Sequence, residues 1–163
     1  MRDWKNKISD NISYTEATKS RTAIKYNINN KPSNDILEKM KIAANKIFEP
    51  LREHFGVPIA VTSFYRSKGL NKKIGGSTTS QHCKGEALDI DADVLGLITN
   101  KQIFDYIKNN LEFDQLIWEY GTNKEPDWVH VSYSEGRNRC KILKTYKEKN
   151  WHGQTITKYK TIY

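Results

Sequence analysis

The feature that most constrains the fold is a short segment, residues 86–91, in which apolar and acidic residues alternate. Leu88 and Ile90 alternate there with Asp89 and Asp91. Successive side chains of a β-strand point to opposite faces of the sheet, so the two carboxylates share one face and the two aliphatic side chains share the other. The pattern predicts a strand with one face against a hydrophobic core.

A second alternating segment, residues 128–133, places a histidine inside an apolar run. Val129 and Val131 fall on one face of the expected strand, and His130 falls on the other. Taken alone, His130 is most simply a buried structural residue. Residues 114–119 read as another strand, and the loop between the two contains glycine and proline, so a hairpin is expected.

The remaining elements follow from periodicity and from turn residues. Between residues 36 and 55 apolar residues recur every three or four positions, which predicts an amphipathic helix that Pro50 kinks or shortens. A strand is expected at 58–65, a short helix at 67–74 and a longer helix after the N-cap residue Thr99.

The two ends of the chain give weaker signals. Residues 1–33 are polar and irregular, and 141–163 form either a basic tail or an edge strand. Since no repeat or linker divides the sequence, residues 1–163 are expected to form a single domain. The order of elements predicts an α+β fold with a mainly antiparallel sheet packed against helices.

The net charge of +8 allows polyanionic partners without choosing among them. The lysines are spread along the chain and no nucleic-acid-binding motif is present, so no nucleic-acid partner is expected. No stretch approaches the length of a membrane span, and the N-terminus lacks the apolar run of a secretory signal. We therefore expect a monomer that is made in the cytoplasm and does not insert into membranes.

The strand carboxylates suggest a metal site. A buried charge is costly unless it is paired, so Asp89 or Asp91 needs a cation or hydrogen-bond donors. Two imidazoles, His82 and His130, with one carboxylate would fill three positions of a tetrahedral zinc ion and leave one for water. Zinc lowers the pKa of such a water to about 7. No HExxH motif is present, so spacing alone leaves the site a hypothesis.

Three segments together resemble the D-Ala-D-Ala metallopeptidase family: residues 63–67, 80–90 and 128–132. This family includes zinc D-Ala-D-Ala carboxypeptidases and phage endolysin peptidases, and it shares its fold with the hedgehog signalling domain. Its pattern is a serine, a histidine two residues later, and an aspartate seven residues after that histidine, with a glycine and an alanine between and a second histidine on a later strand. The matching residues are Ser80, His82, Gly85, Ala87, Asp89 and His130.

The resemblance implies roles for particular residues. It implies that His82, Asp89 and His130 bind one Zn²⁺ ion, with Asp91 as the rival carboxylate on the same strand face. It also implies that Arg66 anchors a carboxylate or carbonyl of the substrate, for which its planar, permanently charged guanidinium is suited.

The motif leaves two candidates for the general base. Many members of the family carry a glutamate three residues before the second histidine, where this chain has Asp127. Glu119, at the end of the neighbouring strand, is the alternative and is slightly favoured because a shorter aspartate reaches less far. Ser80 would hydrogen-bond the substrate or cap its loop, and Trp128 would line the cleft or pack in the core.

The implied function is zinc-dependent hydrolysis of peptide bonds in bacterial peptidoglycan, either in a stem peptide or in a cross-bridge. The enzyme would be a D,D-carboxypeptidase or an endopeptidase of phage or prophage lysis. It would act on the cell wall after release from the cytoplasm or as part of a virion. The alternative is a non-catalytic zinc-containing module that binds the cell wall or belongs to a virion, because a fold by itself does not imply catalysis.

Overall fold

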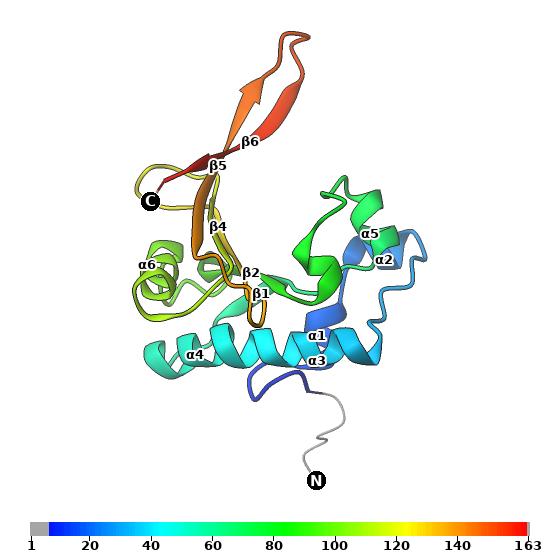
Figure 1. The fold of residues 1–163 in the computed structure, drawn as a ribbon, viewed down its shortest axis with the longest axis vertical. Helices are drawn as coiled ribbons and strands as arrows, with labels where there is room; N and C mark the ends of the chain where they lie inside the picture. The colour runs from blue at the N-terminus through cyan, green and yellow to red at the C-terminus, as the bar shows by residue number, and fades with distance from the viewer. Residues whose placement is uncertain (1–6, 163) are drawn as a thin grey trace.

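The computed structural model describes residues 7–162, which build a six-stranded sheet with helices against it (Figure 1). The strand order is β1-β2-β4-β3-β5-β6, and all neighbours are antiparallel except β3 and β5. The α+β fold with a mainly antiparallel sheet is thus confirmed. The strands are β1 Ala60–Ser63, β2 Ala87–Asp91, β3 Gln115–Glu119, β4 Trp128–Ser132, β5 Lys141–Lys149 and β6 Thr155–Thr161.

Helical segments supply the rest of the fold. The α-helices are α1 Tyr14–Thr18, α2 Arg21–Lys25, α3 Asn34–Ala43, α4 Glu49–Phe55, α5 Lys68–Lys73 and α6 Asn100–Asn110. Two short 3₁₀ turns, η3 Gln81–Lys84 and η4 Ala92–Val94, flank strand β2. None of the helices described here is both long and apolar enough to cross a membrane.

The predicted helix at 36–55 is one rod that continues through Pro50 (Figure 1). Between α3 and α4 the chain forms a π-helical turn, Ala44–Phe48, and Pro50 lies in the first turn of α4. Proline lacks an N–H and crowds the preceding turn, and the wider π turn accommodates both effects without ending the helix. Ser33 provides the N-cap of α3 by accepting a hydrogen bond from the N–H of Ile36.

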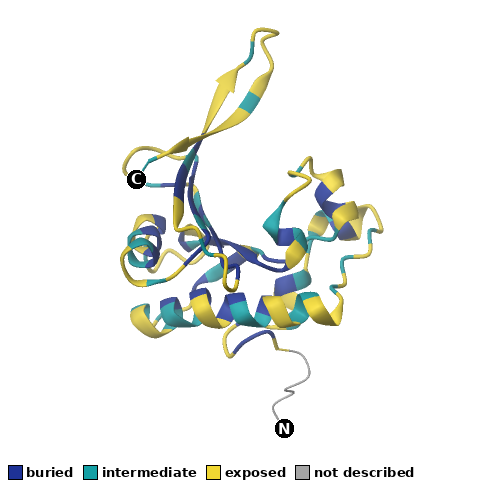
Figure 2. Ribbon diagram, in the orientation of Figure 1, coloured by how far each residue is buried: buried dark blue, intermediate teal, exposed yellow. Residues whose placement is uncertain are grey.

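The two faces of the sheet differ as the alternation predicts. Leu88, Ile90, Val129 and Val131 are fully buried in the core cluster shared with α3, α4 and α6. Burial in Figure 2 is concentrated in the sheet and in the inner sides of these helices. Asp89 and His130 lie on the opposite face, which the long helices leave uncovered.

Residues 7–30 are more ordered than their composition suggests, and residues 1–6 of the segment expected to be irregular lie outside the described residues. Within the described part, Ile12 and Ala17 are buried, and the carbonyl of Ala17 accepts a hydrogen bond from the N–H of Tyr65 at 3.0 Å. Helices α1 and α2 are only five residues each and are capped by Ser13 and Ser20. Elements this short show no periodicity in a sequence. The prediction of an irregular segment was therefore wrong for these two helices.

The C-terminal segment forms strands rather than a loose tail. β5 joins the sheet parallel to β3, and β6 pairs antiparallel with β5 at the sheet edge. The outer part of this hairpin projects well away from the rest of the molecule (Figure 1).

Candidate active site

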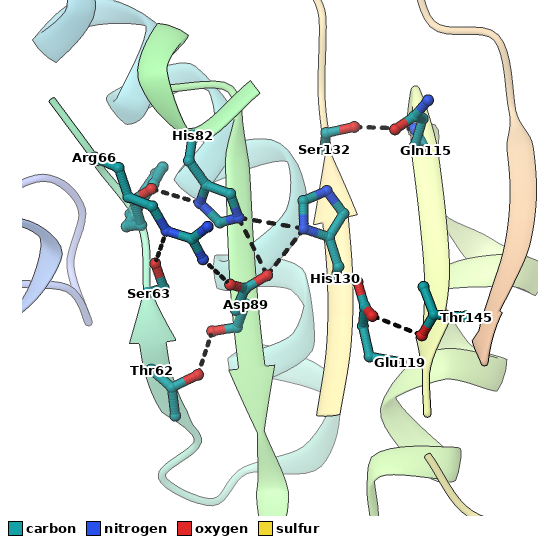
Figure 3. A network of polar contacts seen from close by, with 11 residues as sticks. Thr62, Ser63, Arg66, His82, Asp89, Gln115, Glu119, His130, Ser132 and Thr145 are labelled. Atoms are coloured by element: carbon teal, nitrogen blue, oxygen red, sulfur yellow. Dashed lines mark hydrogen bonds and ion pairs between the residues drawn. The ribbon is translucent and has the colours of Figure 1, made fainter. Parts of the chain in front are cut away.

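Three predicted metal ligands converge on the uncovered face of the sheet (Figure 3). Asp89 on β2 and His130 on β4 are direct partners in the antiparallel register, and His82 reaches them from η3. Asp89 Oδ1 lies 2.9 Å from His130 Nδ1 and 3.2 Å from His82 Nε2, and the two nitrogens are 3.3 Å apart.

These separations fit a tetrahedral zinc ion. Bonds of about 2.0–2.1 Å at tetrahedral angles place ligand atoms roughly 3.3 Å apart. The three distances are close to that value. A set of two imidazoles and one carboxylate also matches zinc's preference for nitrogen and oxygen ligands, and it leaves the fourth position open. The donor set therefore fits the metal that the sequence suggested.

The hydrogen bonding of His82 points its free lone pair at this cluster. His82 is buried, and its Nδ1–H donates to the carbonyl oxygen of Phe64 at 2.7 Å. In a neutral imidazole, Nε2 is then unprotonated and faces Asp89 Oδ1, which is also an acceptor. Two lone pairs facing each other in a buried site require a cation or an added proton between them. The hydrogen bond to the Phe64 carbonyl fixes the tautomer and the ring orientation of His82, as such bonds usually do for metal-binding histidines.

Asp89 is held in its ionised form by its neighbours. Burial alone would raise its pKa, but the positive charge of His82 in its protonated form and the hydrogen bonds that Asp89 accepts from the two imidazoles outweigh burial and keep this pKa well below its usual range. Its second oxygen, Oδ2, accepts a hydrogen bond from Arg66 Nη2 at 2.5 Å. The carboxylate thus offers one oxygen to the cluster and pairs the other with a guanidinium.

Gly85 allows the loop carrying His82 to lie against helix α3. It has a positive φ of 72°, and an added Cβ would lie 2.7 Å from Met40 Cγ and 2.8 Å from the carbonyl oxygen of Ile36. Only glycine fits both the left-handed conformation and the close approach. The glycine of the sequence motif therefore has a structural reason, because it sets the path from His82 to β2.

The structure separates the two rival carboxylates of β2. Asp91 Oδ1 caps η4 by accepting from the N–H of Asp93 at 3.0 Å and also accepts from Asn100 Nδ2 at 3.2 Å. Asp91 is absent from the convergent cluster, and its hydrogen bonds fix the turn after the strand. Asp89 is the carboxylate that meets the two imidazoles.

Glu119 lies on the same sheet face as His130, at the end of β3 (Figure 3). Its side chain is buried, and Oε2 accepts a hydrogen bond from the hydroxyl of Thr145 at 2.7 Å. Burial raises the pKa of Glu119 above its ordinary value, against a lowering by the Thr145 hydrogen bond and the charge of His130. A buried carboxyl with a raised pKa beside a candidate metal site suits proton transfer.

Asp127 occupies a different place. It immediately precedes β4, is exposed, and does not line the cleft around His130. Its N–H donates to the carbonyl of Glu119 at 2.9 Å, and its own carbonyl accepts from Asn100. Strand alternation puts Asp127 on the face of Val129 rather than of His130. Of the two candidate bases, only Glu119 lies in the cleft.

The other predicted site residues surround one open cleft of about 1080 Å³. Arg66, Ser80 and Trp128 all line it together with the three candidate ligands. Arg66 Nε donates to Ser63 Oγ at 2.9 Å, which fixes the guanidinium beside Asp89. Trp128 is half-buried and packs near Tyr120 with ring centroids 5.4 Å apart, so it forms a wall of the cleft.

Several residues at the site carry no sequence signal of their own. Asp114 is 2% exposed and accepts hydrogen bonds from Gln81, the neighbour of His82, and from Arg139 just before β5. Thr145 positions Glu119 from a strand 26 residues away. Pairs this distant in sequence meet only because β3, β4 and β5 are neighbours in the sheet, so no local spacing could have revealed them.

Comparison with known protein families gives one match. Residues 10–132 match the model of the peptidase M15 family, which covers three quarters of the chain, including His82, Asp89 and His130. The chain therefore belongs to the peptidase M15 family, the D-Ala-D-Ala metallopeptidases, which are zinc-dependent. A comparison with curated proteins finds no match.

Proposed function

We propose that this protein hydrolyses peptide bonds of bacterial peptidoglycan with one zinc ion held by His82, Asp89 and His130. The observation that carries the proposal is the meeting of three ligand atoms within 3.3 Å of one another, in an open cleft next to the buried carboxyl of Glu119. Membership of the peptidase M15 family supports peptidase chemistry, and the substrate is our inference.

Different groups in the cleft carry out different parts of the reaction. When bound, zinc acts as a Lewis acid that polarises the scissile carbonyl and makes water more acidic. Glu119 accepts a proton from the attacking water at its carboxylate and delivers it to the leaving amine. The Thr145 hydroxyl holds this carboxylate on the His130 side of the cleft.

Arg66 supports both the metal site and the substrate. Its Nη2 and Nε are committed to Asp89 and Ser63, whereas its Nη1 donors have no hydrogen-bond partner among residues 7–162. Nη1 thus suits a carboxylate or carbonyl of the substrate peptide at the edge of the cleft. Ser80 and Trp128 contribute a hydroxyl and an aromatic wall to the same cleft.

The decisive experiment is digestion of purified peptidoglycan by zinc-loaded protein, followed by mass spectrometry of the released muropeptides. The mass of the products identifies the bond and separates carboxypeptidase from endopeptidase cleavage. Glu119→Gln keeps the size of the side chain and should lower kcat/KM by about 10²–10⁴-fold, the usual contribution of a general base. Zinc content measured by elemental analysis should stay near one ion per chain in this variant.

Asp127→Asn is the matched control, because it makes the same acid-to-amide change outside the cleft. It should leave both activity and zinc content unchanged. Full zinc occupancy without any cleavage, and no effect of either variant, would instead indicate a non-catalytic wall-binding module. Since the proposed substrate lies outside the cell membrane, we place the working enzyme at the cell wall, after release from a cell or as part of a virion.

A further inference from the structure

The β5–β6 hairpin is an addition to the part of the chain that defines the family. The family match ends at residue 132, before β5 begins. β5 pairs with β3 only over residues 141–144, whereas its pairing with β6 runs on to Lys149. The outer hairpin is therefore a two-stranded ribbon with mostly exposed residues, drawn in yellow in Figure 2. Two strands alone are marginally stable, so this ribbon adds surface rather than core.

The hairpin is strongly basic. Residues 141–161 contain six lysines and one acidic residue, Glu148, which leaves five positive charges of the protein's net +8. Strand pairing places Lys141, Lys147 and Lys149 on one face of the hairpin and Lys144, Lys158 and Lys160 on the other. Polyanions are the partners that such a charge density attracts.

The register distributes the charges between two faces. Lys147 and Lys149 lie opposite Thr157 and Thr155, on the face that also carries Leu143 and Tyr159 at the cleft. Glu148 lies on the other face, where it forms an ion pair with Lys158 at 2.7 Å. The face that continues from the cleft is therefore cationic and rich in hydroxyl groups, and it carries no carboxylate among residues 145–161.

This face is joined physically to the cleft by Tyr120. The Tyr120 hydroxyl lies 2.7 Å from Thr157 Oγ1, and Lys147 Nζ lies 5.3 Å from the centre of the Tyr120 ring. Tyr120 also packs near Trp128 in the wall of the cleft. A polymer lying along the hairpin would therefore lead directly to the candidate metal site.

The tip of the hairpin displays an aromatic ring on an ordered turn. Trp151 is 89% exposed, and its ring lies against the His152 ring with centroids 3.4 Å apart and planes tilted by 34°. Asn150 Oδ1 accepts hydrogen bonds from the N–H groups of His152 and Gln154 at 3.1 and 2.9 Å, which fixes the turn. An exposed aromatic face can stack against the C–H groups of a sugar ring. Its neighbours in the turn are polar, which disfavours insertion into a bilayer.

We propose that the cleft-side face of this hairpin binds an anionic polysaccharide of the bacterial wall and holds the enzyme on its insoluble substrate. The lysines pair with the phosphate or carboxylate groups of the polymer, the threonine and tyrosine hydroxyls hydrogen-bond its sugars, and Trp151 stacks on a ring. This inference rests on the proposed function for its biological setting. The binding itself is measurable without catalysis.

The test compares binding of zinc-loaded full-length protein to purified walls before and after chemical removal of their anionic polymers. Wild type should bind untreated walls at least about tenfold more tightly than stripped walls, and less tightly as salt rises, because the attraction is ionic. Lys147→Gln/Lys149→Gln should weaken binding to untreated walls about tenfold and leave binding to stripped walls unchanged. Cleavage of a soluble muropeptide should stay at the wild-type rate.

Lys158→Gln/Lys160→Gln is the matched control, since it removes the same charge from the opposite face. It should weaken wall binding less than about twofold. An equal loss in both double variants, or equal binding to stripped and untreated walls, overturns the proposal. So does tighter binding to DNA or to anionic lipid vesicles than to untreated walls at physiological salt. Failure of soluble cleavage by wild type would refute the proposed function separately.

Discussion

Replacing Asp114 by asparagine tests how the loop before β3, the segment before β5 and the loop carrying His82 are held together. Asp114 Oδ2 accepts from Gln81 Nε2 at 2.8 Å and from Arg139 Nη2 at 2.7 Å, while Oδ1 accepts from Arg139 Nε at 2.7 Å. In asparagine, one oxygen becomes an amide NH₂, which donates rather than accepts. At least one strong hydrogen bond is therefore lost, and a donor faces another donor.

The expected change in the free energy of unfolding follows from the charge of Asp114 and the exposure of Arg139. Hydrogen bonds to a charged group contribute about 1.5–3 kcal/mol each. The Arg139 side chain is 57% exposed, so water screens its pairing and takes over its donors in the variant. We therefore expect a loss of about 2 kcal/mol in the free energy of unfolding. For a protein of this size that corresponds to a fall in Tm of about 4–8 °C.

The stability lost in the Asp114→Asn variant should be smaller at low pH. Burial alone would raise the pKa of Asp114, but the hydrogen bonds from Arg139 and Gln81 outweigh it and lower the pKa below the ordinary value. A carboxyl with a lowered folded-state pKa adds stability above its unfolded pKa of about 3.9 and loses it as the pH falls through the folded value. The gap between wild type and variant should narrow below about pH 4.

Urea denaturation and thermal melting at pH 7 and pH 3 measure this gap. Asp105→Asn is the control, because Asp105 is a helix residue whose side chain is 44% exposed and paired with Lys101, so the change should alter stability by less than about 0.5 kcal/mol. A variant of Asp114 as stable as wild type at pH 7, or a gap that does not shrink at low pH, would refute the reasoning.

Three further predictions follow from the same structure. Chelation of a metal present at 100 times its Kd should remove about 2.7 kcal/mol of stability and lower Tm by roughly 5–11 °C; an unchanged melt would contradict a metal site. Asn100→Ala should cost about 1–3 kcal/mol in urea denaturation, because the buried Asn100 accepts from the N–H of Ala92 at 2.7 Å. Gly85→Ala should lower Tm more than Gly75→Ala. Both glycines have a positive φ, but of the two only Gly85 lacks space for a Cβ. Equal melting temperatures would contradict a close contact between Gly85 and α3.

The sequence by itself determined which side chains share a face. The alternation of Leu88 and Ile90 with Asp89 and Asp91, and of Val129 and Val131 with His130, separated Asp89 and His130 from the aliphatic core residues, because the side-chain period of a strand is two whatever its neighbours are. The helix periodicity at 36–55 likewise identified the buried face of α3 and α4. The family motif predicted the three ligand candidates, and the structure brings them together.

Only the tertiary structure decided between residues that the local pattern treats alike. Asp91 shares a strand face with Asp89, but its side chain hydrogen-bonds to η4 and Asn100. Glu119 lines the cleft with His130 because β3 pairs with β4, whereas Asp127 does not line it. These outcomes depend on register and on partners from distant strands. A sequence specifies the direction of a side chain within its own element, whereas the neighbours that pair with it, bury it or shift its pKa come from the packing of elements far apart in the chain.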